Sequence, residues 1–118
     1  MNLKQAKEIE KQSELALQLC KYLHKNPELS FQEFETAKKM AKVLSDAGFK
    51  VTENFGGNSV VGVLQNGDGP VVLFRTDMDA LPMKEKTALN FASTKKVKDK
   101  NGEETPVLHA CGHDIHMS

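Results

Sequence analysis

The sequence predicts an α/β domain, and three features carry that prediction. Apolar side chains recur at helical spacing before Gly48, the pattern changes to strand-like alternation after it, and Val71–Phe74 is apolar on consecutive positions. A continuous apolar run fits a strand buried on both faces better than a surface hairpin. Helices followed by a sheet with a buried central strand indicate the α/β class, and 118 residues suffice for one domain.

The first helix is expected from about Gln5 to Lys25, where an apolar stripe runs along one side. The stripe consists of Ile9, Ala16, Leu19, Cys20 and Leu23. Pro27 lacks an amide hydrogen and disfavours helical geometry in the residue before it, so the helix should end near Asn26. Cys20 is interpreted as a small apolar residue of the stripe. His24 and Lys25 are interpreted as positive charge at the negative end of the helix dipole.

A second helix is expected to begin directly after the first. Ser30 followed by Glu33 has the spacing of a capping box, in which each side chain satisfies a backbone amide of the other. The face of this helix is marked by Phe34, Ala37, Ala41 and Leu44. Gly48 is expected to end it in the left-handed conformation.

Short extended segments are expected in the rest of the chain. "FKVTENF" alternates, "SVVGVLQ" is β-branched and apolar, and "PVVLFRTDMDALP" follows the turn "NGDG". Near the end, "ASTKKVKDKNGEETPVLH" is expected to form two arms joined at Asn101-Gly102, a strong hairpin dipeptide. The lysines on those arms are interrupted by acids, which is typical of a solvated hairpin.

Composition excludes several classes of function. Sixteen basic and sixteen acidic residues give a formal charge of zero, which disfavours nucleic acid or an anionic membrane as a partner. The chain has no apolar run long enough to cross a bilayer, and its polar N-terminus lacks the apolar core of a signal peptide, so a cytoplasmic location is expected. Its two cysteines cannot form a disulfide framework.

The first chemical motif is "FRTDMDALP", directly after the apolar run. Arg75, Asp77 and Asp79 alternate, which places them on one side of an extended chain. Polar groups that follow a buried strand are well positioned for a site at the end of a sheet. An Arg–Asp ion pair that closes the strand end explains the same residues equally well.

The second motif is the tail "VLHACGHDIHMS", which holds three of the four histidines. Cys111 and His113 place a thiolate and an imidazole on either side of Gly112, which allows both to turn toward one metal ion. Asp114 and His116 are candidates for further ligands or for groups that orient the ligands. Two alternatives remain open: Cys111 and His113 as a nucleophile and its base, and a polar loop without a site.

Taken together, "LHKNPELSFQEFETA", "VVLFRTDMDALP" and "HACGHDIHM" resemble the M20 family of metal-dependent amidohydrolases. The resemblance is to the branch of hippurate hydrolases, N-acyl-amino-acid amidohydrolases, diaminopimelate deacetylases and auxin-conjugate hydrolases. It implies that residues 1–118 are the N-terminal part of a zinc-peptidase-like α/β/α catalytic domain with a mixed sheet. It implies two divalent metal ions (zinc, manganese or nickel) per complete site, with Cys111 and His113 as ligands. Asp77 corresponds to an aspartate that orients the metal centre, and Arg75 stands where other M20 enzymes have a histidine ligand.

The function implied by the resemblance is hydrolysis of the amide bond of small N-acyl amino acids or peptide-like conjugates. By the same resemblance, the general-base glutamate, the other metal ligands and a smaller dimerisation domain lie downstream of Ser118. The segment alone is therefore expected to be inactive, and the full-length protein is expected to be a homodimer. The alternatives are a cysteine hydrolase that uses Cys111 and His113, and a non-catalytic metal-binding or interaction module.

Overall fold

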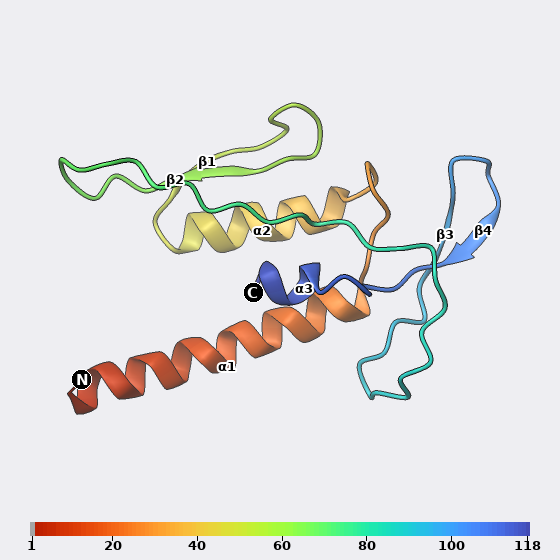
Figure 1. The fold of residues 1–118 in the computed structure, drawn as a ribbon, viewed down its shortest axis with the longest axis horizontal. Helices are drawn as coiled ribbons and strands as arrows, with labels where there is room; N and C mark the ends of the chain where they lie inside the picture. The colour runs from red at the N-terminus through yellow and green to blue at the C-terminus, as the bar shows by residue number, and fades with distance from the viewer. Residues whose placement is uncertain (1) are drawn as a thin grey trace.

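The computed structural model describes residues 2–118 and has helices and small sheets, which confirms the α/β class (Figure 1). Along the chain the elements are α1 (Leu3–Lys25), α2 (Phe34–Asp46), β1 (Lys50–Thr52), β2 (Val61–Val63), β3 (Lys96–Lys98), β4 (Glu104–Pro106) and α3 (His113–His116). β1 pairs with β2 and β3 pairs with β4, both antiparallel, in two separate two-stranded sheets. No helix in the described part of the chain is long and apolar enough to span a membrane.

Helix α1 confirms the first predicted helix and ends where expected. Asn2 and Gln5 form a capping box at its start, which satisfies two backbone amides, and Asn26 is its C-cap, directly before Pro27. The apolar stripe is buried only toward the C-terminal end, because Leu23 is 1% exposed whereas Ile9 is 56% exposed. In Figure 1 the N-terminal half of α1 extends beyond the other elements, so only its last turns contribute to the core.

Helix α2 starts later than predicted, and the expected Ser30–Glu33 capping box is wrong. The helix begins at Phe34, and Glu33 at the N-cap position makes no capping hydrogen bond through its side chain. Instead, the carboxylate of Glu28 accepts hydrogen bonds from the backbone amides of Glu35 and Thr36, at 3.3 and 2.8 Å. The first turn is therefore capped by a buried carboxylate from the connecting segment, which also joins α1 to α2.

The chain leaves α2 as the sequence predicts. Gly48 adopts a φ of 88°, the left-handed conformation expected of a helix stop. β1 and β2 then form a hairpin that packs on α2. At Gly62 a Cβ atom would lie 3.1 Å from the side chain of Phe49 and 3.2 Å from that of Leu44, so a larger residue there would require these side chains to shift.

The prediction for Val71–Phe74 is wrong. These residues are extended but form no strand, and their side chains are 86 to 99% exposed. A buried central strand needs a neighbouring strand on each edge and a layer on each face. None of the other described residues supplies a ladder partner for this segment. The apolar run is therefore an uncovered surface in this chain.

The β3–β4 hairpin confirms the prediction at Asn101-Gly102. Gly102 has a φ of 83°, and one carboxylate oxygen of Asp99 accepts hydrogen bonds from the backbone amides of Asn101 and Glu103. Lys96 and Lys98 are exposed on the arm, as expected of a solvated hairpin. The short helix α3 packs against α1. The buried apolar residues are Leu23, Ala37, Ala41, Ala80, Val107 and Met117.

Candidate functional site

Two β-bridges bring the two chemical motifs together. Ala80 forms a parallel bridge with Leu29, and its amide donates a hydrogen bond of 2.7 Å to the carbonyl of Glu28. Leu81 and Leu108 form an antiparallel bridge with reciprocal hydrogen bonds of 2.9 and 3.0 Å. The segment that ends "DMDALP" therefore lies beside the start of "HACGHD", although they are far apart in the sequence.

His113 is held by the first motif through Asp79. The Nδ1 atom of His113 lies 2.8 Å from the carbonyl oxygen of Asp79 and 3.1 Å from its carboxylate. Both partners are acceptors, so Nδ1 carries the hydrogen, and in the neutral form of the ring the lone pair lies on Nε2. A carboxylate or carbonyl on one ring nitrogen is the usual arrangement that orients a histidine to bind metal through the other.

Gly112 sets the direction of the two candidate ligands. Its φ of 77° is left-handed, and it starts α3, so Cys111 and His113 flank a sharp turn. The thiol of Cys111 is free and exposed. Among the described residues, no hydrogen bond joins Cys111 to His113, whose ring is held by Asp79 through Nδ1. A cysteine nucleophile would need such a bond to its base, so this geometry favours two separate donors over a nucleophile pair.

Asp114 points away from the turn and into the protein, where it is 3% exposed. Its carboxylate lies 2.7 Å from Nδ1 of His24, and Nε2 of the same ring lies 3.0 Å from the carboxylate of Glu85. Ionised carboxylates only accept hydrogen bonds, so with both carboxylates ionised the two contacts correspond to a doubly protonated imidazole. Burial lowers the pKa of His24, but the hydrogen bonds to Glu85 and Asp114 outweigh it and raise the pKa above its ordinary value.

This cluster was missed from the sequence, where His24 was interpreted as a helix-end charge and Glu85 was not singled out. The one available signal was the position of His24, directly after Leu23 at the buried end of the apolar stripe. Its partners lie 61 and 90 positions away along the chain. Contacts at that separation leave no periodicity in the sequence.

His109 is the least satisfied polar group of the tail. Its side chain is buried, with a residue exposure of 5%, and neither ring nitrogen has a hydrogen-bond partner among the described residues. Burial lowers the pKa of this imidazole, because it disfavours the charged form. A buried ring without partners is costly, so its nitrogens are available to a polar group that approaches this part of the fold.

Asp77 lies apart from the turn, on the surface. Its carboxylate accepts a hydrogen bond of 2.6 Å from Arg75, and the side chains are 52% and 77% exposed. This is the ion pair that the sequence left open as an explanation of the motif. Of the alternating acids it is Asp79, and not Asp77, that contacts His113. The ring of His116 is exposed and lies 6.0 Å from that of His113, measured between centroids.

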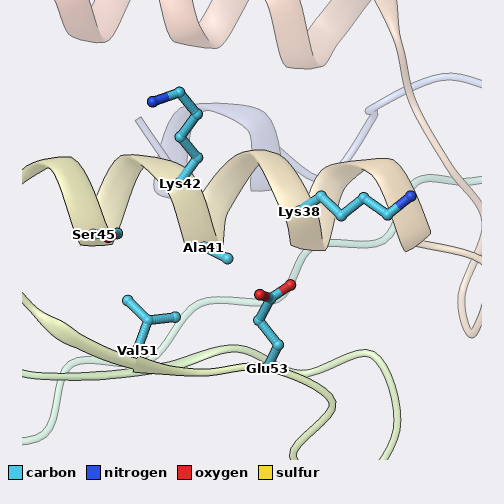
Figure 2. Close-up of a pocket in the computed structure, with 6 residues that line it drawn as sticks. All are labelled: Lys38, Ala41, Lys42, Ser45, Val51 and Glu53. Carbon is cyan, nitrogen blue, oxygen red and sulfur yellow. The ribbon is translucent and has the colours of Figure 1, made fainter.

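The site has fewer donors than a closed metal centre. Within residues 2–118, no group of three or more histidine, cysteine, aspartate or glutamate side chains is placed to hold a metal ion. The pocket drawn in Figure 2 is elsewhere, between α2 and β1, and is lined by Lys38, Ala41, Lys42, Ser45, Val51 and Glu53. Lys38 and Lys42 form ion pairs with acidic residues of their own helix, so we do not consider this pocket a candidate site.

The fold and the turn thus define an α/β protein with a candidate metal-ligating pair, and comparison with known proteins identifies its family. Residues 73–118 match the model of peptidase family M20/M25/M40. Hippurate hydrolase of Campylobacter jejuni is 44% identical over 97 residues, which are 81% of this chain and 23% of that protein. N-acetylcysteine deacetylase of Bacillus subtilis is 41% identical over 98 residues, again 81% of this chain and 23% of the relative.

A solved structure agrees with the sequence relatives. The YXEP protein of Bacillus subtilis, described as a dinuclear metal-binding peptidase of the M20 family, superimposes with a TM-score of 0.72 at 36% identity. The match covers 86% of this chain and 26% of that one. The chain belongs to the M20 peptidase family, and it spans about a quarter of the length of these relatives.

Proposed function

We propose that this chain is the N-terminal part of the catalytic domain of a metal-dependent amidohydrolase. The observation that carries the proposal is the turn at Gly112, where Asp79 holds the His113 ring through Nδ1 and the thiol of Cys111, on the other side of the glycine, is exposed. The substrates proposed are small N-acyl amino acids or peptide-like conjugates. Hippurate and N-acetylcysteine, the substrates in the relatives' names, are both N-acyl amino acids.

The proposal includes a longer protein around this segment. Three observations support it: the chain spans about a quarter of its relatives, Val71–Phe74 is uncovered, and residues 2–118 place too few donors near the turn to close a metal site. The remaining strands, ligands, general base and a smaller dimerisation domain would come from the rest of the catalytic protein. We propose that this protein acts in the cytoplasm as a homodimer.

In the proposed site, Cys111 and His113 would hold divalent metal, with two ions in the complete site. Thiolate and imidazole suit zinc, manganese or nickel to different degrees, so the donors restrict the metal without selecting one. Bound metal of this kind polarises a carbonyl and lowers the pKa of water. The chain's own contribution is orientation: Asp79 holds the His113 ring, and Asp77 is proposed to orient the centre from the segment that follows Phe74.

The test is a metal and substrate assay on the full-length protein. We expect metal to copurify, and we expect a chelator to abolish hydrolysis of N-acetyl and N-benzoyl amino acids. Cys111→Ser and His113→Ala should each lower both metal content and activity, whereas Lys100→Gln on the exposed hairpin should change neither. The 118-residue chain alone should show no turnover.

The cysteine-hydrolase alternative makes the opposite predictions. Alkylation of Cys111 by iodoacetamide should be slowed by added metal if the thiol is a ligand. Rapid labelling at a rate that does not depend on added metal, together with hydrolysis that continues in the presence of a chelator, would contradict the proposal. It would favour Cys111 as a nucleophile. A full-length protein that binds metal but hydrolyses no acyl amino acid or peptide would favour the non-catalytic module.

A further inference from the structure

We propose that His24 is a positioning residue, which holds the Cys111–His113 turn in the geometry that binds metal. The inference rests on the proposed function and adds to it a group from α1 that touches neither metal nor substrate. Its evidence is a cluster of charges buried between α1, α3 and the loop around Glu85.

The His24 imidazole joins two carboxylates. Its Nδ1 lies 2.7 Å from Asp114 and its Nε2 lies 3.0 Å from Glu85, and all three side chains are largely buried, with exposures of 13%, 4% and 1%. Charge-assisted hydrogen bonds at these distances are strong and directional. The ring is therefore fixed in position and in orientation by partners on two different elements.

The far side of the cluster is anchored as well. Glu85 accepts hydrogen bonds from the hydroxyl of Thr87 and from the backbone amide of Ser93, in addition to His24. The ring of Phe91 packs edge-on against the His24 ring, with centroids 5.4 Å apart. Glu85 is held by its own loop, so it cannot follow a displaced imidazole. The position of the His24 ring therefore determines the position of the Asp114 carboxylate.

Asp114 directly follows His113, so the turn is held from two sides. Asp79 binds the ring of His113 from the segment before the bridge at Ala80, and His24 binds the next side chain from α1. Fixing two consecutive residues of a four-residue helix leaves little freedom for Gly112 and Cys111 before them. The cluster thus orients the ligand pair without using any atom that metal needs.

Stability alone is a weak explanation for such a cluster. Removing three charged groups from water is unfavourable, and apolar residues of similar size often stabilise a protein as well or better. Groups that orient ligands from outside the coordination shell typically change metal affinity by about 10- to 100-fold when replaced. Affinity is therefore the quantity that separates positioning from mere packing.

The experiment measures metal affinity in the metal-free full-length protein, by competition with a chromophoric chelator. His24→Gln should weaken zinc binding by about 10- to 100-fold. It should also change the thiolate-to-cobalt charge-transfer absorption of the cobalt-loaded protein, which reports the geometry at Cys111. Glu85→Gln keeps the shape but removes one charge from the cluster, and should change both measurements in the same direction. Lys25→Gln removes an exposed charge from the adjacent position of α1 and should change neither.

The outcomes separate this inference from the proposed function. If Cys111→Ser abolishes zinc binding but His24→Gln and Glu85→Gln bind zinc as the unmodified protein does, the positioning role is wrong and the metal site stands. A Cys111→Ser variant that binds zinc normally would overturn the proposed ligand pair and this inference with it. If His24→Gln does not fold, Glu85→Gln decides the question by the same two measurements.

Discussion

Glu28 shows how a single buried carboxylate can replace a local capping motif. It is 7% exposed, it accepts the amides of Glu35 and Thr36, and Lys95 lies 3.8 Å away on the hairpin side. The spacing of Ser30 and Glu33 is that of a capping box, but the turn of the backbone at Phe31, with a φ of 65°, comes before the helix starts and prevents them from capping α2.

Replacement of Glu28 should therefore destabilise the protein more than replacement of Ser30. We expect Glu28→Ala to lower the free energy of unfolding by about 1 to 2 kcal/mol, because it removes the hydrogen bonds that cap α2. Ser30→Ala should stay within about 0.5 kcal/mol of the unmodified protein. Urea unfolding followed by circular dichroism measures both. A larger loss of unfolding free energy for Ser30→Ala than for Glu28→Ala would indicate that Ser30 caps α2 and would contradict the role of Glu28.

At the scale of elements, α1 and α3 are joined by charge as well as by apolar packing. Leu23 and Met117 are buried on these elements, and His24 bridges Asp114 to Glu85 beside them. The charges of His24 and Asp114 also act on the buried ring of His109, whose pKa is lowered mainly by burial. The contact between the two helices should therefore depend on the protonation of His24.

Stability should fall as pH rises above 6.5. The folded protein raises the pKa of His24 from its ordinary 6.5, so this contribution is complete below 6.5 and is lost as pH rises through the raised pKa. The pKa of Glu85 is lowered from 4.5 because its hydrogen bonds outweigh burial, so its contribution is complete above 4.5 and is lost as pH falls through the lowered pKa. Both contributions are therefore complete between pH 4.5 and 6.5.

The measurement is the free energy of unfolding of the metal-free protein across these pH values. His24→Gln should remove the decline above pH 6.5, because glutamine does not titrate. Lys25→Gln serves as the control and should decline as the unmodified protein does. A decline that persists unchanged in His24→Gln would assign the pH dependence to another group.

At the scale of the whole molecule, the exposed run Val71–Phe74 is the largest departure from a self-sufficient domain. Phe74 is 86% exposed here, whereas an apolar run of this kind in an α/β protein belongs to the middle of a sheet. Uncovered apolar backbone with free edges also favours association between chains. The run is therefore expected to be covered in the longer protein proposed above.

Phe74→Ala should distinguish the two contexts. In the longer protein we expect it to cost about 3 to 5 kcal/mol of unfolding free energy, the usual loss for a buried phenylalanine. In the 118-residue chain the same change should stay within about 0.5 kcal/mol and should reduce self-association measured by light scattering. An equally small effect in both contexts would show that the run is not covered and would contradict the proposed domain organisation.

By itself the sequence determined the features that depend on near neighbours. These are the span and end of α1, the left-handed stop at Gly48 and the hairpin at Asn101-Gly102. Each follows from side-chain spacing or backbone preference within a few residues, which a single sequence displays directly. The family motifs belong to the same kind of information, because they are read along the chain.

Only the tertiary structure decided which distant groups meet. It selected Asp79 rather than Asp77 as the partner of His113, it placed His24 between Glu85 and Asp114, and it left Val71–Phe74 uncovered. These contacts depend on the bridges at Ala80 and Leu81, which pair segments that are remote in sequence. A hydrogen bond across 90 positions depends on how the elements pack, and the local pattern around either partner carries no record of it.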